Sequence, residues 1–179
     1  MAGKKQLNES PSQTAGPYVH IGCIPAYAGI EGVYKQDIWG NSPVDQAGTT
    51  LKVRIFDGDG APVTDALIEI WIAGLKFWAR SAFDEDSLSY PFQIPKTNSW
   101  AGQTSDDAIP FISVWIVARG VNIGLHTRIY FPDMENDVDK VLNQVEETRR
   151  GSLIANESND GYTFDIYLQG ERETVFFDI

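Results

Sequence analysis

The sequence predicts an all-β protein, a β-sandwich with one short helix. Residues 51–56 alternate apolar and polar side chains, as a strand with one buried face does. Asp57-Gly58 follows directly, and this pair favours a hairpin because glycine accepts a positive φ. Many further short strand patterns, separated by turn residues, recur along the chain. Such a series is typical of two packed antiparallel sheets.

The next expected strand, residues 66–72, places Ile68, Ile70 and Ile72 on one face and Leu67, Glu69 and Trp71 on the other. We interpret Trp71 as a core aromatic. Residues 111–117 form a nearly continuous apolar run, which predicts a strand buried on both faces. The other expected strands are 89–94, 126–131, 162–168 and 173–177.

The helix is expected after Pro132-Asp133, over residues 134–150. Val138, Val141, Leu142 and Val145 recur there at helical spacing, and Arg149-Arg150 would complement the dipole at its end. Gly151 is the expected stop.

Length and composition narrow the class of protein. The 179 residues fit one domain, with residues 1–17 as an extended N-terminal arm and residues 18–179 as a single β-sandwich domain. A net charge of −11 without any basic run argues against nucleic-acid binding. No apolar run is long enough for a membrane helix. The lone Cys23 cannot form an internal disulfide, so we expect a reducing, cytoplasmic location.

Three segments carry a family resemblance. They are residues 10–22 (SPSQTAGPYVHIG), residues 118–131 (ARGVNIGLHTRIYF), and the C-terminal stretch with FDI at 164–166, QGE at 169–171 and ETVFFDI at 173–179. Together with the hairpin over residues 53–63 and the Glu69-Ile70-Trp71 that follows, they resemble the alpha chains of heteromeric intradiol ring-cleaving dioxygenases. The resemblance implies a β-sandwich of the intradiol dioxygenase type.

The catalytic chains of that family hold Fe(III) with two Tyr and two His, and none of the four stands at the matching positions here. Residues 72–80 contain no Tyr, and the family's long loop is shortened there. Residues 97–100 also lack Tyr, and the His-x-His pair is replaced by Phe111-Ile112-Ser113. Phe and Ser cannot replace phenolate and imidazole ligands. We therefore expect no metal ligand and no catalytic residue in this chain, with Fe(III) carried by a partner beta chain.

The resemblance also assigns residues to a substrate pocket shared between the two chains. They are Thr14, Gly16, Pro17, Tyr18 and Arg119. Arg119 could meet the carboxylate of an aromatic acid, and Tyr18 could form a wall with an apolar face and a hydroxyl tip. The alternatives are that Thr14 and Pro17 only order the arm, that Tyr18 packs in the contact between chains, and that Arg119 pairs with an acidic residue.

The activity implied by the resemblance is cleavage of a small aromatic substrate, 3,4-dihydroxybenzoate, between its hydroxyl groups by O₂, giving 3-carboxy-cis,cis-muconate. The chain would complete the active site of the iron-bearing beta subunit in an α/β hetero-oligomer, with its arm packed on that partner. The alternative is a non-catalytic β-sandwich of the same descent that acts as a scaffold or binding module, which the shortened region 73–110 favours.

Overall fold

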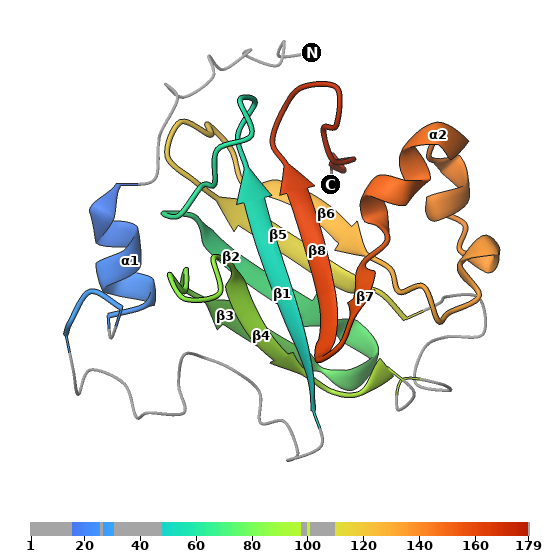
Figure 1. Cartoon of the computed structure of the whole chain (residues 1–179), viewed down its shortest axis with the longest axis horizontal. Helices are drawn as coiled ribbons and strands as arrows, with labels where there is room; N and C mark the ends of the chain where they lie inside the picture. Colours follow the sequence, from blue (N-terminus) through green and yellow to red (C-terminus); the bar gives the residue numbers. More distant parts are fainter. Residues whose placement is uncertain (1–15, 26, 31–47, 98–99, 101–109, 179) are drawn as a thin grey trace, which may run out of the picture.

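Two β-sheets dominate the computed structural model, which describes residues 16–25, 27–30, 48–97, 100 and 110–178. Figure 1 shows their arrangement, with α1 at one side of the sheets and α2 at the other. The elements in chain order are α1 (Pro17–Cys23), β1 (Thr49–Phe56), β2 (Leu67–Ile72), β3 (Phe77–Ser81), β4 (Tyr90–Ile94), β5 (Ile112–Val117), β6 (Leu125–Ile129), α2 (Glu147–Arg150), β7 (Asn156–Ser158) and β8 (Gly161–Tyr167).

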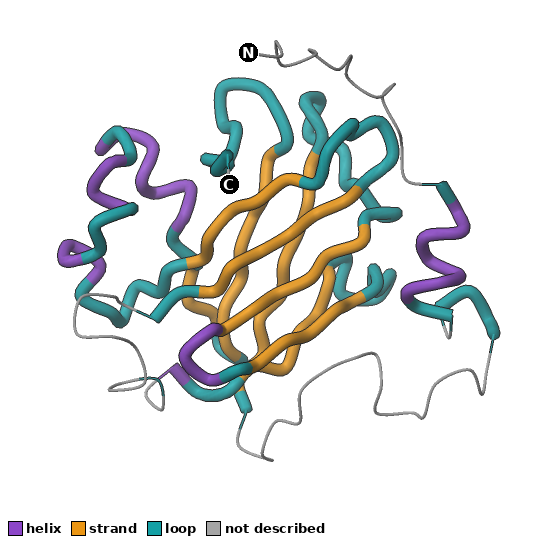
Figure 2. The backbone as a smooth tube through the Cα atoms, turned by 180° about the vertical axis from the view of Figure 1, so that it is seen from behind, coloured by secondary structure: helices purple, strands orange, loops and turns teal. Residues whose placement is uncertain are grey.

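Within the described ranges, the strands form two four-stranded sheets with the orders β4-β1-β8-β7 and β3-β2-β5-β6. All pairings are antiparallel except that of β1 with β8. Figure 2 shows the second sheet lying in front of the first. The core lies between them, because alternate residues of each strand point to the facing sheet; Val53 and Ile55 of β1, and Val114 and Ile116 of β5, are at most 2% exposed. The predicted fold class is confirmed.

The outer face of the β3-β2-β5-β6 sheet differs from the sequence-based expectation. Strand β5 alternates between buried and half-buried residues, so it is not buried on both faces. Trp71 is 50% exposed and is not a core residue. Its ring lies 5.9 Å from that of Trp78 on β3. The half-buried positions of β5 are Ser113, Trp115 and Val117, and sequence periodicity alone does not separate such partial burial of apolar residues from full burial.

The segment 134–150 is not one continuous helix. It consists of two short 3₁₀ turns, Asn136–Val138 and Leu142–Gln144, followed by α2. The carboxylate of Asp139 interrupts it, because Oδ1 accepts the backbone N–H groups of Val141 and Leu142 at 2.9 and 2.7 Å. Such local side-chain bonds compete with helical ones. The α-helical part does end where expected, because α2 stops at Arg150 with Gly151 as its C-cap residue, and the chain continues as a 3₁₀ turn, Gly151–Leu153.

The C-terminal segment 173–177 is not a strand, although it runs beside β6. Phe177 N–H donates to the carbonyl of His126 at 2.8 Å, and the Thr127 hydroxyl donates to the carbonyl of Val175 at 2.7 Å. Thr174 is fully buried and its hydroxyl accepts the N–H of Tyr167 at 3.0 Å. In two of these three hydrogen bonds, one partner is a threonine hydroxyl and not a backbone group. The segment is therefore extended but forms no regular ladder of backbone hydrogen bonds.

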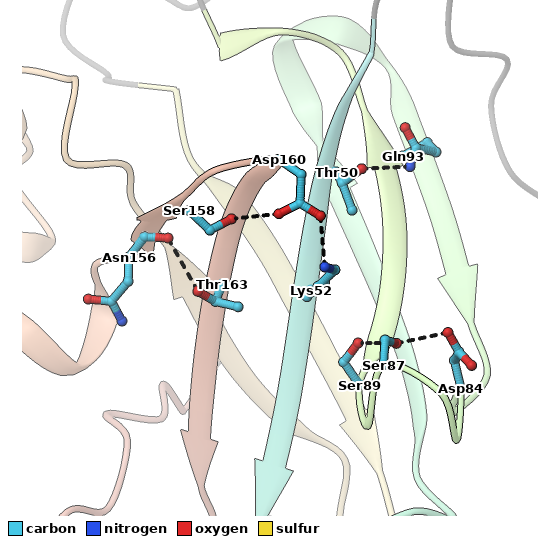
Figure 3. Close-up of polar contacts among 10 residues, drawn as sticks. All are labelled: Thr50, Lys52, Asp84, Ser87, Ser89, Gln93, Asn156, Ser158, Asp160 and Thr163. Carbon is cyan, nitrogen blue, oxygen red and sulfur yellow. Dashed lines mark hydrogen bonds and ion pairs between the residues drawn. The ribbon is translucent and has the colours of Figure 1, made fainter.

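On the outer face of the β4-β1-β8-β7 sheet, polar side chains form contacts between neighbouring strands (Figure 3). Lys52 Nζ on β1 lies 2.8 Å from Asp160 Oδ2 in the β7–β8 turn, and Gln93 on β4 donates to the Thr50 hydroxyl at 3.0 Å. These cross-strand contacts fix β1 relative to both of its neighbours. No helix in the described part of the chain is long and apolar enough to cross a membrane.

Candidate functional site

Helix α1 and the residue before it hold three of the predicted pocket residues. Gly16 precedes it and accepts the N–H of Val19 at 3.0 Å, Pro17 is its first residue, and Tyr18 follows with 81% of its surface exposed. A proline at the first helical position fits, because its missing N–H would have no helical partner. Sequence reasoning expected an extended arm up to Pro17 and missed this helix. Thr14 lies outside the described residues.

The end of α1 is anchored to the β-sandwich. Arg80 Nη1 on β3 donates to the carbonyl of Cys23 at 2.9 Å, and the same guanidinium forms an ion pair with Glu69 on β2. Ile24, directly after α1, is 1% exposed. The anchor holds the helix against the sandwich while Tyr18 and Ile21 stay exposed.

Arg119 lies in the loop between β5 and β6. Its backbone belongs to a tight turn in which Val121 N–H donates to the carbonyl of the buried Ala118 at 3.1 Å. Gly120 has φ +82°, a conformation that L side chains rarely adopt, which explains the glycine. The Arg119 side chain is 77% exposed, and its Nη2 lies 3.2 Å from Oδ2 of Asp65.

Arg119 and Asp65 border a groove of about 520 Å³, which we call the Arg119 groove. Its apolar wall consists of partly buried residues that pack on the main core, Val63, Val121, Leu125 and Leu168. Its polar wall includes Asp57 and Gln169. Three loops therefore meet here, and the groove combines an apolar surface with one cation at its edge.

The four predicted pocket residues within the described part of the chain lie on two segments that are far apart in the sequence. Tyr18 lies on α1 and Arg119 on the β5–β6 loop, and among the described residues no hydrogen bond or ion pair joins them. Their role in a shared pocket stays a prediction. Sequence reasoning missed Asp65, because nothing in the pattern pairs it with a residue so far along the chain.

The position of the family's His-x-His pair holds a different arrangement. The guanidinium carbon of Arg128 lies 4.0 Å from the centroid of the Phe111 ring and 5.5 Å from that of Phe177. Ser113 pairs in register with Arg128 across β5 and β6. A phenyl ring is no ligand and a guanidinium repels a metal cation, so these residues do not fit an iron ion.

The other ligand positions are also occupied by structural residues. Residues 73–75 form a 3₁₀ turn that leads into β3. Trp100 is 1% exposed, packs edge-on against Phe131 at 5.2 Å and donates its indole N–H to the carbonyl of Pro95 at 3.2 Å. Across the described ranges, His, Cys, Asp and Glu side chains form no group of three or more that could hold a metal ion.

A buried polar network continues from Arg128. Its Nη1 donates to the Tyr130 hydroxyl at 3.2 Å, and that hydroxyl donates to Asp139 Oδ1 at 3.0 Å. Tyr130 has no exposed surface and Asp139 is 3% exposed. Burial raises the pKa of the Tyr130 hydroxyl to about 12. The network is a structural feature that supports the cluster around Phe111.

Comparison with known proteins shows which family the chain is related to. No family model matches the chain. It is 36% identical over 196 residues to the protocatechuate 3,4-dioxygenase alpha chain of Pseudomonas putida, covering 96% of this chain and 97% of that one. It is 31% identical over 198 residues to the protein of the same name from Burkholderia cepacia, covering 97% and 98%.

Among solved structures, the dioxygenase domain of a dioxygenase carbohydrate-binding protein fusion from Streptomyces sp. SirexAA-E is 20% identical, with 94% of this chain and 100% of that chain covered and a TM-score of 0.48. The β-sandwich and the sequence relationship to the two curated relatives define a protein of the intradiol ring-cleaving dioxygenase class. Within that class, the chain belongs to the family of protocatechuate 3,4-dioxygenase alpha chains.

Proposed function

We propose that the chain is the alpha subunit of a protocatechuate 3,4-dioxygenase and that a partner beta chain carries the Fe(III). The observation that supports this most is the combination of a family relationship along almost the whole chain with the Phe111–Arg128 contact at the His-x-His position. The assembled enzyme cleaves 3,4-dihydroxybenzoate with O₂ to 3-carboxy-cis,cis-muconate. Bound in the partner chain, Fe(III) would supply the chemistry that activates the catecholate.

The contribution of this chain is to bind and orient the substrate. Arg119 is an exposed guanidinium at the edge of a groove, and it would hold the substrate carboxylate through charge-assisted hydrogen bonds. Tyr18, on the anchored helix α1, would form a wall for the ring. Gly16, with nothing within 4 Å of its Cβ position, would let the backbone approach a flat ring closely, and Pro17 follows it in the same proposed wall. Thr14 belongs to the same proposed wall.

The arm and α1 would form the contact with the partner. Residues 1–17 are proposed to pack on the beta chain, with residues 18–179 as the single sandwich domain. Tyr18 is 81% and Ile21 39% exposed, and the following turn exposes Tyr27 and Ile30 by 47% and 40%. Exposed apolar side chains gathered on one segment mark an interaction surface. We further propose a cytoplasmic α/β hetero-oligomer, consistent with the free Cys23.

The alternative, a scaffold or binding module of the same descent, rests on the short turn Ala73–Leu75 in place of the family's long loop. The two functions are separated by measuring iron and ring cleavage for this chain, for the cognate beta chain and for the two together. If the chain is an alpha subunit, the iron will be found in the beta chain, and full activity will be measured only when the two chains are combined. The proposal would be overturned by one iron per isolated alpha chain, or by a beta chain that has the same activity with and without this chain.

A further inference from the structure

We propose that Asp65 is the positioning residue of Arg119 and that Tyr90 holds Asp65 in place from inside the sandwich. Together they would make the enzyme selective for ring substrates that bear a carboxylate. This inference rests on the proposed function, in which Arg119 contacts the substrate carboxylate. It adds two residues that neither the sequence pattern nor the family relationship singles out.

The first step is the contact between Asp65 and Arg119. Oδ2 of Asp65 lies 3.2 Å from Nη2 of Arg119, so the two side chains form an ion pair. Both side chains are accessible, at 41% and 77% exposure. An arginine held through one nitrogen can still present other N–H groups of its planar fork to an incoming carboxylate. Asp65 can therefore orient the Arg119 guanidinium while other N–H groups of that guanidinium bind the substrate carboxylate.

The second step is the contact that holds the backbone around Asp65 in position. Tyr90 lies on β4 of one sheet, while Asp65 lies in the loop that leads into β2 of the other, separated from that strand by Ala66. The Tyr90 hydroxyl donates to the carbonyl of Val63 at 2.8 Å and accepts the N–H of Ala66 at 2.9 Å. One hydroxyl thus bonds the backbone on both sides of residues 64–65. Tyr90 has no exposed surface, so these bonds are shielded from water.

The ring of Tyr90 is itself fixed. It packs edge-on against Phe83 with centroids 5.4 Å apart, and its backbone pairs with Val53 of β1. Burial raises the pKa of its hydroxyl, which therefore stays protonated as a donor at neutral pH. The backbone of Arg119 is held by the turn from Ala118 to Val121. Both ends of the Asp65–Arg119 pair consequently start from ordered backbone, and the pair reduces the remaining side-chain freedom.

The sign of the effect separates positioning from simple electrostatics. If Asp65 acted only as a negative charge, its removal would favour an anionic substrate and lower KM. If it positions Arg119, its removal costs orientation and raises KM. Exposed ion pairs are individually weak, so we expect a rise of roughly two- to fivefold.

The experiment uses the enzyme assembled with its beta chain and compares 3,4-dihydroxybenzoate with catechol, which has no carboxylate. In Asp65→Asn we expect KM for 3,4-dihydroxybenzoate to rise by roughly two- to fivefold with kcat nearly unchanged, and KM for catechol to stay the same. Asp65→Glu should recover part of the change. Asp59→Asn is the matched control, because it removes one exposed carboxylate from the same loop without touching Arg119, and it should leave both KM values unchanged.

Two further variants test the mechanism. In an Arg119→Ala background, Asp65→Asn should add nothing, because its effect passes through Arg119. Tyr90→Phe, which keeps the ring and removes the hydroxyl, should reproduce the selective KM rise. An unchanged or lower KM in Asp65→Asn, or additive effects in the double variant, overturns the inference while Arg119→Ala still raises KM. If Arg119→Ala has no effect either, the proposed function itself fails at this residue.

Discussion

The guanidinium of Arg128 is held between two aromatic rings, 4.0 Å from the centroid of Phe111 and 5.5 Å from that of Phe177. Phe111 stands where the catalytic chains of the family have a histidine. Phe111 and Phe177 belong to a small second core, in which they pack with the buried Tyr130, Leu142 and Leu153. The contact between Phe111 and Arg128 is therefore part of a packed cluster.

The first prediction concerns this cluster. Arg128→Met should lower the free energy of unfolding by about 1–3 kcal/mol, because it removes two ring contacts and leaves the buried Asp139 carboxylate without its nearby cation at 4.0 Å. Arg172→Met is the control. Arg172 also covers a ring, at 4.2 Å from Tyr167, but it lies at the exposed surface, and we expect a loss of roughly 0.5 kcal/mol. Urea unfolding followed by tryptophan fluorescence measures both, and equal losses would contradict the account.

The second prediction concerns alkaline pH. The pKa of the buried Tyr130 hydroxyl is raised to about 12, above the usual value near 10, so folding favours the protonated form. This contribution to stability is complete below pH 10 and is lost as the pH rises towards 12. The free energy of unfolding should fall by about 2 kcal/mol over that window because of Tyr130.

Comparison with Tyr130→Phe isolates this residue. Tyr90 acts in the same direction in both proteins, so the difference between their pH profiles reports Tyr130 alone. Phenolate absorbance at 295 nm should show one tyrosine fewer titrating late in the variant. Parallel stability profiles for the two proteins between pH 10 and 12 would show that the Tyr130 pKa does not differ between the folded and unfolded states.

Much of the fold could be predicted from the sequence because its strands have regular local patterns. Residues 51–56 and 66–72 alternate as β1 and β2 do, and Asp57-Gly58 lies in the turn that follows β1. The expected helix over 134–150 was wrong because the carboxylate of Asp139 bonds two backbone amides, which hydrophobic spacing does not reveal. The exposed Trp71 was misjudged because a half-exposed aromatic on the outer face of a sheet has the same sequence pattern as one in a core.

The candidate site was predictable only in part. The motif containing Arg119 is contiguous in sequence, so the resemblance could point to it. The Asp65–Arg119 pair and the Tyr90 bonds join residues from different strands and loops, and their meeting depends on how the two sheets pack. Arg128 falls within a recognised segment, yet its contact with Phe111 follows from the β5–β6 register, which the sequence does not specify.

The third prediction concerns the partner contact at α1. Tyr18→Ser with Ile21→Ser should weaken association with the beta chain by roughly tenfold or more, since each removes an exposed apolar anchor worth on the order of 1 kcal/mol. Val138→Ser is the control. Val138 is 59% exposed but lies in the 3₁₀ turn Asn136–Val138, near α2 on the other side of the molecule (Figure 1). Isothermal titration calorimetry compares them, and an equal loss for Val138→Ser would exclude α1 as a specific contact.

The most direct measurement is steady-state kinetics of the assembled enzyme with Arg119→Ala and Tyr18→Ala, on 3,4-dihydroxybenzoate and on catechol. A lost charge-assisted contact is worth roughly 1.5–3 kcal/mol, so Arg119→Ala should raise KM for 3,4-dihydroxybenzoate about tenfold or more and leave catechol almost unaffected. Tyr18→Ala should weaken the binding of both substrates alike, since it removes part of the pocket wall and no charge. If Arg119→Ala leaves both KM values unchanged while size-exclusion chromatography shows intact assembly, Arg119 does not bind the substrate and the alpha chain does not complete the pocket through it.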